Sequence, residues 1–372
     1  MALGFGIIGC GMISKFHARA IADVRGSKLI ACYNRTLPAA EKLAAEFGGT
    51  AYTDLDDFLA HPGLDVVTIG TPSGAHLEPT LAAAQAGKHV IVEKPLEITL
   101  KRCDAMIQAC REAGVLLGTI FPSRFHRSSQ LLKRAVDQGR FGRMTMGDAY
   151  VKWYRSQEYY DSGAWRGTWE LDGGGALMNQ AIHTVDLLTW LMGPVLEISA
   201  FTATLAHERI EVEDTATATL RFASGALGVI EATTTAFPGS LKKVELHGSE
   251  GSAVLQEEDI IQWEFAKKKS QDAKLLEEMS QRTETGGGAA DPAAIGHHGH
   301  TAIFKDFANA IKKGTPPAID GAEGRRSVEI ILGLYKAAET GKRVAFPLPK
   351  DPILKARTEK NDCHDSTAVE SS

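Results

Sequence analysis

The sequence predicts an α/β protein with two domains: a doubly wound parallel sheet, then an α+β domain with a large, mostly antiparallel open sheet. In the first third of the chain, short β-rich runs alternate with helical patterns, which is typical of βαβ units. Further on, β-rich runs follow one another with only short turns between them, which favours antiparallel pairing. We expect the first domain at residues 1–121, the second at 122–348, and a C-terminal segment at 349–372 that is disordered at its end.

The elements of the first domain follow from hydrophobic periodicity. Compact runs rich in Val and Ile predict strands at 4–8, 28–33, 65–70, 88–93 and 115–120. Apolar residues at helical spacing predict helices at 13–24, 38–47, 76–86 and 99–113. This alternation makes the parallel order of the strands the expected one.

In the second domain, the pattern predicts a helix at 125–138, a strand at 143–153 and an aromatic loop at 153–169. A helix that contains His183 comes next. Strands are then expected at 195–206, 213–222, 226–236, 242–248 and 252–265, and closing helices at 301–313 and 324–341.

Charge and composition exclude several classes of protein. The 372 residues include 41 Lys plus Arg and 46 Asp plus Glu, a net charge of −5, so no overall basic field favours nucleic acid or anionic lipid. No apolar run reaches the ~18–20 residues of a membrane span. The five cysteines show no pair at two-residue spacing, so we expect buried thiols, no metal knuckle and a reducing, cytoplasmic location.

The first predicted strand leads directly into a glycine-rich turn. Gly9, Gly11, Met12 and Ile13 belong to a G-x-G-x-x-G pattern in which Ser14 replaces the last glycine. A strand before the motif and a helix after it give the context in which backbone amides bind a pyrophosphate. The turn therefore predicts a Rossmann-type dinucleotide-binding domain; the alternative is a strand–helix turn without a ligand.

The position that contacts the adenosine ribose falls about 20 residues beyond the motif, at Asn34. An acid there would repel a 2′-phosphate, whereas Asn34 is neutral and is followed by Arg35. We therefore expect NAD(P), with NADP slightly favoured. The alternative is that Arg35 only stacks on the adenine of NAD.

Two later motifs sharpen this interpretation. The first is Thr71-Pro72-Ser73-Gly74-Ala75-His76, followed after a helix by Glu93-Lys94-Pro95 at a strand end. The second is G-G-G-x-L-x-x-Q-x-x-H-x-x-D at 173–186. Together with the glycine turn, they resemble the glucose–fructose oxidoreductase/inositol dehydrogenase/rhizopine-catabolism (Gfo/Idh/MocA) family over residues 3–348.

The resemblance implies catalytic roles. In that family the lysine of E-K-P and the histidine of the second motif lie at the nicotinamide and the substrate carbinol, which here are Lys94 and His183. The family often has Asp four residues before that histidine, where this chain has Asn179. The same departure is seen in members that resemble nucleotide-sugar 3-dehydrogenases. Asn179 therefore keeps a hydrogen-bonding role, and proton transfer there is in doubt. His183 suits the base that takes the hydroxyl proton. Asn179, His183 and Asp186 are expected on one face of a helix, and structural and functional roles for Asp186 are equally supported.

The same resemblance places Thr71, Pro72 and His76 beside the ribose and nicotinamide, with Glu93 and Lys94 completing the cofactor site. The alternative for His76 is that it caps its helix.

The aromatic loop is the expected substrate side. Tyr154, Arg155, Trp165 and Arg166 fit a sugar site, because rings stack on pyranose faces and Arg bonds hydroxyls or a carboxylate. A hydrophobic plug or an interface is equally compatible. Residues 280–300 are polar and Gly-rich and end in three histidines at 297–300, where no nearby carboxylate or Cys pattern completes a metal site. His297 or His300 is expected to reach the sugar.

These observations predict an NAD(P)-dependent oxidoreductase that oxidises a secondary hydroxyl of a sugar, cyclitol or sugar derivative, or runs the reverse reduction. The second hypothesis is a redox-assisted glycoside-cleaving enzyme that oxidises the sugar transiently and recycles NAD. The third is a non-catalytic dinucleotide sensor, disfavoured because Lys94 and His183 are both present. By resemblance, a homodimer or homotetramer forms through the C-terminal sheet. No nucleic-acid or membrane partner is expected.

Overall fold

The protein divides into two structural units. The computed structural model describes residues 2–280 and 296–354. Unit 1 consists of residues 2–126 and Gly296–Val328, and unit 2 of residues 127–280 and 329–354. Among these residues, no helix has both the length and the apolar character needed to cross a membrane.

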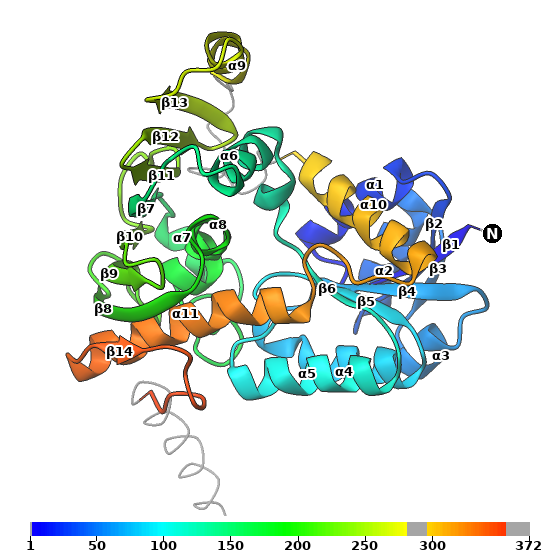
Figure 1. The fold of residues 1–372 in the computed structure, drawn as a ribbon. Coiled ribbons are helices and arrows are strands. Elements are labelled where there is room, and N and C mark those ends of the chain that lie inside the picture. The colour runs from blue at the N-terminus through cyan, green and yellow to red at the C-terminus, as the bar shows by residue number, and fades with distance from the viewer. Residues whose placement is uncertain (1, 281–295, 355–372) are drawn as a thin grey trace, which may run out of the picture. The chain divides into compact units, whose positions relative to one another are not determined.

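Unit 1 is built on a six-stranded sheet in which all pairs are parallel (Figure 1). Its strand order is β3-β2-β1-β4-β5-β6, so the order reverses between β1 and β4, where ligands bind in open α/β sheets. The strands are β1 (Leu3–Ile8), β2 (Ser27–Tyr33), β3 (Thr50–Tyr52), β4 (Leu64–Ile69), β5 (His89–Val92) and β6 (Leu117–Thr119). The parallel sheet predicted from the alternating pattern is confirmed.

The connections of unit 1 are helical. They are α1 (Met12–Asp23), α2 (Leu37–Phe47), α3 (Leu55–Leu59), η1 (Ser73–Ala75), α4 (Leu77–Gln85), α5 (Leu100–Glu112) and η2 (Pro122–Phe125), with α10 (His298–Lys313) joining later. The sequence analysis missed β3 and α3, because three and five residues are too few to show a period.

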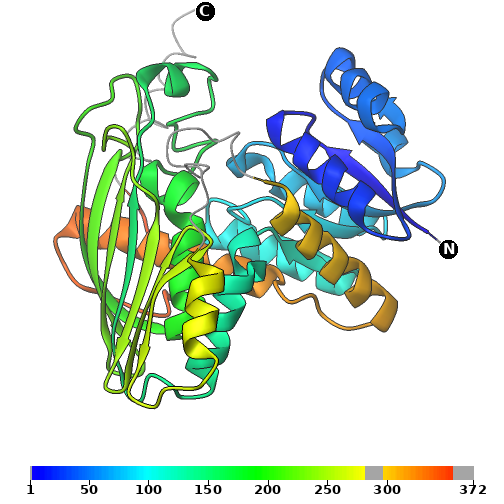
Figure 2. The same ribbon diagram turned by 90° about the horizontal axis from the view of Figure 1, so that it is seen from above.

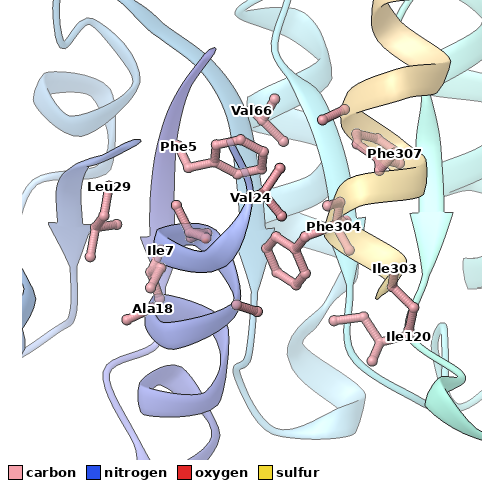
Figure 3. Close-up of a cluster of buried hydrophobic side chains, with 14 of the residues drawn as sticks. Phe5, Ile7, Ala18, Val24, Leu29, Val66, Ile120, Ile303, Phe304 and Phe307 are labelled. Carbon is pink, nitrogen blue, oxygen red and sulfur yellow. The ribbon is translucent and has the colours of Figure 1, made fainter. Parts of the chain in front are cut away.

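The helix α10 belongs to unit 1, although the sequence analysis had grouped residues 296–328 with the second domain. Phe304 and Phe307 are fully buried in a core with Phe5 of β1 and Val24 (Figure 3). The rings of Phe5 and Phe304 lie 5.8 Å apart. This apolar face of α10 has its partner in unit 1, which sequence order alone does not reveal.

Unit 2 is built on an eight-stranded sheet of order β13-β12-β11-β7-β10-β9-β8-β14, whose strands are labelled in Figure 1. Figure 2 shows much of this sheet as green to yellow-green strands that lie side by side. All its pairs are antiparallel except β10 with β7. The strands are β7 (Met144–Lys152), β8 (Val195–Ala203), β9 (Thr215–Phe222), β10 (Leu227–Thr233), β11 (Lys243–Gly248), β12 (Gly251–Gln256), β13 (Asp259–Phe265) and β14 (Val344–Ala345). The single strand expected at 252–265 is wrong: a turn at Glu257, with φ of 51°, divides it into β12 and β13.

The helices of unit 2 are α6 (Arg127–Asp137), α7 (Gln157–Asp161), α8 (Ile182–Met192), α9 (Asp272–Met279) and the π-helical turn η3 (Ala176–Ala181). The long helix α11 (Gly321–Thr340) runs through the division between the units. The helix α8, which follows η3 directly, packs on β7 and β11 and is almost entirely buried. This packing holds α8 in place on the sheet.

The described residues contain four free cysteines: Cys32, Cys103 and Cys110 are buried, as expected, whereas Cys10 is only partly buried. Burial raises the pKa of the Cys10, Cys32 and Cys110 thiols to about 12, which favours the thiol over the thiolate at neutral pH. Cys363 and most of the predicted C-terminal segment lie outside the described residues.

Candidate active site

The glycine-rich turn has the shape that a pyrophosphate requires. Gly9 has φ of +93°, and an added Cβ would lie 2.9 Å from the carbonyl oxygen of Gly70, so only glycine lets β1 and β4 approach here. A Cβ on Gly11 would meet nothing within 4 Å, which leaves space beside the backbone. The Ser14 hydroxyl donates to the Gly11 carbonyl at 2.5 Å and so replaces the third glycine of the motif with a small, buried residue.

The start of α1 presents an anion-binding end. Gly11 is its N-cap, no side chain caps it, and no acid lies in its first turn. Met12 is 53% exposed. Because the first amides of a helix point outward and the helix dipole is positive there, the residues present fit the pyrophosphate of a dinucleotide.

Asn34 connects the end of β2 to this turn. Its Oδ1 accepts from the Cys10 amide at 3.2 Å, and its Nδ2 donates to the Thr36 hydroxyl at 2.9 Å. Arg35 is exposed. No acid therefore occupies the position expected to contact the ribose, and the neutral side chain there is held in place.

His76 links the loop after β4 to the loop after β5 by hydrogen bonds from its ring. This buried ring contacts the Pro95 carbonyl at 2.9 Å through Nδ1 and the Thr71 carbonyl at 3.0 Å through Nε2. Thr71 also donates its hydroxyl to the Ala75 carbonyl at 2.8 Å, while Pro72 begins η1 as its N-cap. His76 occupies the N-cap position of α4, as the alternative expected, but its side chain makes no capping hydrogen bond.

Glu93 and Lys94 follow β5 directly. Glu93 is buried, and its Oε2 accepts the Lys94 amide at 3.1 Å. Its Oε1 lies 2.9 Å from His17 Nε2 and 3.4 Å from His300 Nε2. His300 is therefore buried within unit 1, whereas His297 pairs with Asp23 at 3.0 Å.

In unit 2 a polar network joins the aromatic loop to η3. Arg155, which is 3% exposed, donates to Gln180 Oε1 at 3.0 Å, and Gln180 donates to the Tyr159 hydroxyl at 2.9 Å. Arg166 reaches the same hydroxyl at 2.6 Å. The structure thus brings both predicted arginines to one set of side chains beside Asn179, to which Gln180 donates at 2.8 Å.

Asn179 also donates to the buried carboxylate of Asp172, whose second oxygen accepts the Gly167 amide at 2.9 Å. An acid therefore contacts the residue at which this chain departs from the family pattern. The sequence analysis missed Asp172 and Tyr159 as members of the site. Tyr159 lies in the aromatic loop that was singled out, but nothing in the spacing connects Asp172 to Asn179.

The turn that contains Asn179 is held by hydrogen bonds to Glu213. Its Oε2 accepts the Gly175 amide at 3.0 Å and its Oε1 accepts the Leu177 amide at 2.8 Å, while its own carbonyl accepts the Ala176 amide at 3.0 Å. Tyr335 adds its hydroxyl to Oε1 at 2.9 Å. Burial raises the pKa of Glu213 to about 7, although these donors favour its charged form.

The remaining predicted residues are placed as follows. Asn179 lies in the π-helical η3 and His183 in α8, so they do not share one continuous α-helical face as expected. His183 is half-buried, and Asp186 is fully buried, which excludes a surface role for Asp186. Trp165 stacks on the Arg166 guanidinium at 4.5 Å, whereas Tyr154 packs edge-on against Phe237.

The comparisons with known proteins agree with this geometry. The family model "Oxidoreductase family, NAD-binding Rossmann fold" matches residues 3–121, and "GFO/IDH/MocA C-terminal domain" matches residues 129–254. The chain is 30% identical to the myo-inositol 2-dehydrogenase of Thermotoga maritima over 363 residues, which covers 91% of this chain and 97% of the relative. It is 31% identical over 303 residues to the levoglucosan dehydrogenase of Pseudarthrobacter phenanthrenivorans, covering 71% of this chain and 76% of that one.

Among solved structures, the chain is similar to the WlbA dehydrogenase of Bordetella pertussis in complex with NADH and UDP-GlcNAcA. The identity is 37%, the TM-score is 0.84, and 93% of this chain and 98% of that chain are covered.

A parallel sheet with an anion-binding glycine turn at its switch point, followed by a large mostly antiparallel sheet, defines a two-domain, NAD-binding oxidoreductase of the sugar and cyclitol dehydrogenase type. This chain belongs to the GFO/IDH/MocA family, which confirms the resemblance seen in the sequence. The expectation of an enzyme that acts on CH–OH groups is confirmed with it.

Proposed function

We propose that the enzyme oxidises a secondary hydroxyl of a nucleotide-linked sugar that bears a carboxylate. The observation that supports this substrate class is the network of Arg155, Gln180, Tyr159 and Arg166 next to Asn179. Two guanidinium groups among aromatic rings suit a sugar ring with an acidic substituent, because Arg binds carboxylates through paired N–H donors. The similarity to WlbA, whose complex contains UDP-GlcNAcA, supports the same class.

The proposed chemistry is hydride transfer to the nicotinamide, for which the bound NAD(P) supplies the acceptor. His183 takes the hydroxyl proton, and Lys94 stabilises the developing alkoxide with its charge. Asn179 orients the hydroxyl by hydrogen bonding, with Asp172 holding the amide of Asn179 in place. The α1 end, with Gly9 and Gly11, holds the pyrophosphate.

A substrate panel with both cofactors tests this proposal. UDP-linked hexuronic acids, the matching UDP-hexoses, free uronic acids, inositols and levoglucosan are each incubated with enzyme and NAD or NADP, and reduced cofactor is followed by absorbance. We expect turnover to be greatest with the UDP-linked acid. A higher kcat/KM for an inositol or levoglucosan would overturn the substrate class while leaving the dehydrogenase class intact.

The redox-assisted glycoside-cleaving hypothesis gives a different signal in the same assay. A net dehydrogenase accumulates reduced cofactor in proportion to the ketone formed. Transient oxidation releases the aglycone while reduced cofactor stays below stoichiometry with product. Release of free UDP with catalytic amounts of NAD would therefore replace the dehydrogenase proposal by this second one.

The cofactor preference is proposed to depend on Asn34 and Arg35. A neutral Asn34 beside an exposed Arg35 favours NADP slightly, whereas the NADH bound to WlbA and levoglucosan dehydrogenase favours NAD. In Asn34→Asp, the added charge should weaken NADP binding selectively, measured by calorimetry with each cofactor. Equal weakening of NAD and NADP would show that Asn34 does not face the 2′ position but only supports the turn through Cys10.

We further propose a homodimer or homotetramer formed through the outer face of the unit 2 sheet. Along β9, Thr217, Thr219 and Arg221 are exposed and alternate with buried neighbours, so one face of the sheet is open at this strand. Light scattering of the wild type and of Thr219→Arg tests this, and a monomeric wild type would overturn it. The reduced cysteines support a reducing compartment, for which the cytoplasm is proposed.

A further inference from the structure

A buried cluster in unit 1 brings together residues that are far apart in the sequence. Three buried side chains meet here: His17 of α1, Glu93 at the end of β5 and His300 of α10. Both imidazole Nε2 atoms approach the same oxygen, Glu93 Oε1, at 2.9 and 3.4 Å. Thr68 of β4 completes the cluster at 3.0 Å from His17 Nδ1. We refer to His17, Glu93 and His300 as the His–Glu–His cluster.

Hydrogen-bond logic fixes the protons of this cluster. An ionised carboxylate only accepts, so each Nε2 atom must bear a hydrogen to bond Glu93. When His17 is neutral, as its lowered pKa favours, the Thr68 hydroxyl donates to its bare Nδ1. Within the described residues, the buried Nδ1 of His300 has no hydrogen-bond partner.

The electrostatics point the same way. Burial lowers the pKa of His17 despite the nearby carboxylate. Burial alone would raise the pKa of Glu93, but the hydrogen bonds from His17 and His300 hold it well below its usual value. The cluster therefore contains one buried negative charge held by hydrogen-bond donors, and the cost of burying that charge is offset only while the donors stay in place.

The second carboxylate oxygen of Glu93 connects the His–Glu–His cluster to Lys94. Glu93 Oε2 accepts the backbone amide of Lys94, the first residue beyond Glu93 on the loop after β5. We propose that Glu93 is a positioning residue whose carboxylate, held by His17 and His300, fixes the backbone from which Lys94 reaches the reacting carbinol. This inference rests on the proposed role of Lys94. It also explains why His300, expected near the sugar, lies buried against Glu93 instead.

Kinetics of matched variants test the positioning role. In Glu93→Gln one oxygen becomes an N–H₂ group that faces N–H donors, so we expect kcat to fall about 10–100-fold while KM for NAD changes less than about threefold. His300→Leu removes one donor and should lower kcat about tenfold, whereas His300→Gln returns an N–H donor and should restore most of the loss. His89→Gln, on the same strand but at its other end, is the control; its Nδ1 accepts the Leu116 amide.

A purely structural role would lower the amount of folded enzyme and leave kcat per folded active site unchanged, so active sites are counted by NADH binding. Unchanged kcat in Glu93→Gln, or equal losses in His300→Leu and His300→Gln, would overturn the positioning role.

A second measurement does not depend on the substrate. Nitrogen-15 NMR of the imidazoles in the full chain reports tautomer and charge directly. At neutral pH we expect His17 to be neutral and protonated at Nε2, with the His17 and His300 signals both perturbed in Glu93→Gln and unperturbed in His89→Gln. An imidazolium at His17, or displacement of both signals by stoichiometric Zn²⁺ with loss of activity on chelation, would overturn the cluster as described. If no substrate on the panel is turned over, the proposed function fails, and this experiment still decides the cluster.

Discussion

Each unit contains one buried glutamate that holds backbone amides next to a proposed catalytic side chain, and the two glutamates are held differently. Glu93 in unit 1 has two imidazoles and one amide as partners. Glu213 in unit 2 has two amides and the Tyr335 hydroxyl. The pKa of Glu93 lies well below its usual value, whereas burial raises that of Glu213 to about 7. Both carboxylates are buried, so the balance between burial and the donors sets each pKa: the donors outweigh burial at Glu93, and burial outweighs the donors at Glu213.

Because the two pKa values are shifted in opposite directions, the two glutamates change the free energy of unfolding in opposite directions as pH falls. Glu213 binds its proton more tightly when folded, so its contribution to stability is greatest at low pH and falls as pH rises from about 4.5 to about 7. Glu93 binds its proton less tightly when folded, so its contribution is present above about 4.5 and is lost as pH falls through its lowered pKa. His17, whose pKa is lowered from 6.5, also favours the folded state less as pH falls below that value.

The largest expected effect concerns the two groups proposed to be catalytic, Lys94 from unit 1 and His183 from unit 2. Loss of a general base costs roughly 10²–10⁴-fold in rate. We expect His183→Ala to lower kcat by about that factor with cofactor binding nearly intact, and Lys94→Ala to do the same or more because it also removes a charge near the nicotinamide. Steady-state kinetics of both single variants and the double variant measure this.

The double variant compares the two units directly. If Lys94 and His183 act as one proton relay, the combined loss will be less than the product of the single losses. Full multiplication of the losses would show that the units act independently. Wild-type kcat in His183→Ala at saturating substrate would remove His183 as the base.

The next effect concerns the pH response of Glu213. In Glu213→Gln no proton can be bound, so the unfolding free energy should lose the wild-type fall between about pH 4.5 and 7. The difference between the two proteins should change across this window by roughly 2–4 kcal/mol, as follows from a pKa shift of this size. Hydrogen exchange of the Gly175 and Leu177 amides gives the local measurement. Parallel pH curves for the two proteins would show that Glu213 does not titrate in this range.

A substitution confined to unit 1 is expected to have a smaller effect. Gly11→Val puts a branched side chain where a Cβ now meets nothing, so it fills space proposed for the pyrophosphate without disturbing the fold. Dinucleotide affinity should fall at least about tenfold, or 1.4 kcal/mol, by calorimetry, with a smaller loss in Gly11→Ala. The melting temperature without cofactor serves as the control. Unchanged affinity would contradict the assignment of this turn.

How much the sequence could predict also differs between the units. In unit 1 the glycine turn and the strand end at Glu93-Lys94 are local features, and the parallel sheet they predicted is confirmed. The partners of Glu93 were missed because His300 comes from a helix more than 200 residues along the chain, beyond any period or spacing.

In unit 2, Asn179 and His183 were expected on one regular helix. The π-helical turn η3 was missed because Glu213, from the start of the next hairpin, holds three successive amides. The run of glycines at 173–175 was a signal that the sequence did show. The structure gives the reason at Gly174, which has φ of +157° and where an added Cβ would lie 2.1 Å from the Tyr335 hydroxyl. The sequence showed that the backbone must be unusual at this point, but not what packs against it.

The smallest predicted effect concerns Tyr335, the side chain that donates to Glu213 in the described part of the chain. Tyr335→Phe removes the hydroxyl 2.9 Å from Oε1 and leaves the ring against Trp169. A hydrogen bond to a charged group contributes about 1.5–3 kcal/mol and one to a neutral group about 0.5–1.5 kcal/mol. The loss of stability should therefore be greater above the pKa of Glu213 than below it, by about 1 kcal/mol. The pKa of Glu213 should also rise further, because a donor to the charged form is gone.

Denaturant titrations at about pH 5 and pH 8 measure the difference, with Tyr52→Phe in unit 1 as the control for losing a tyrosine hydroxyl. A loss that is the same at both pH values would mean that the hydroxyl supports Glu213 equally in either charge state. The contrast with Glu93, whose donors keep it ionised, would then depend on the imidazoles of unit 1 alone.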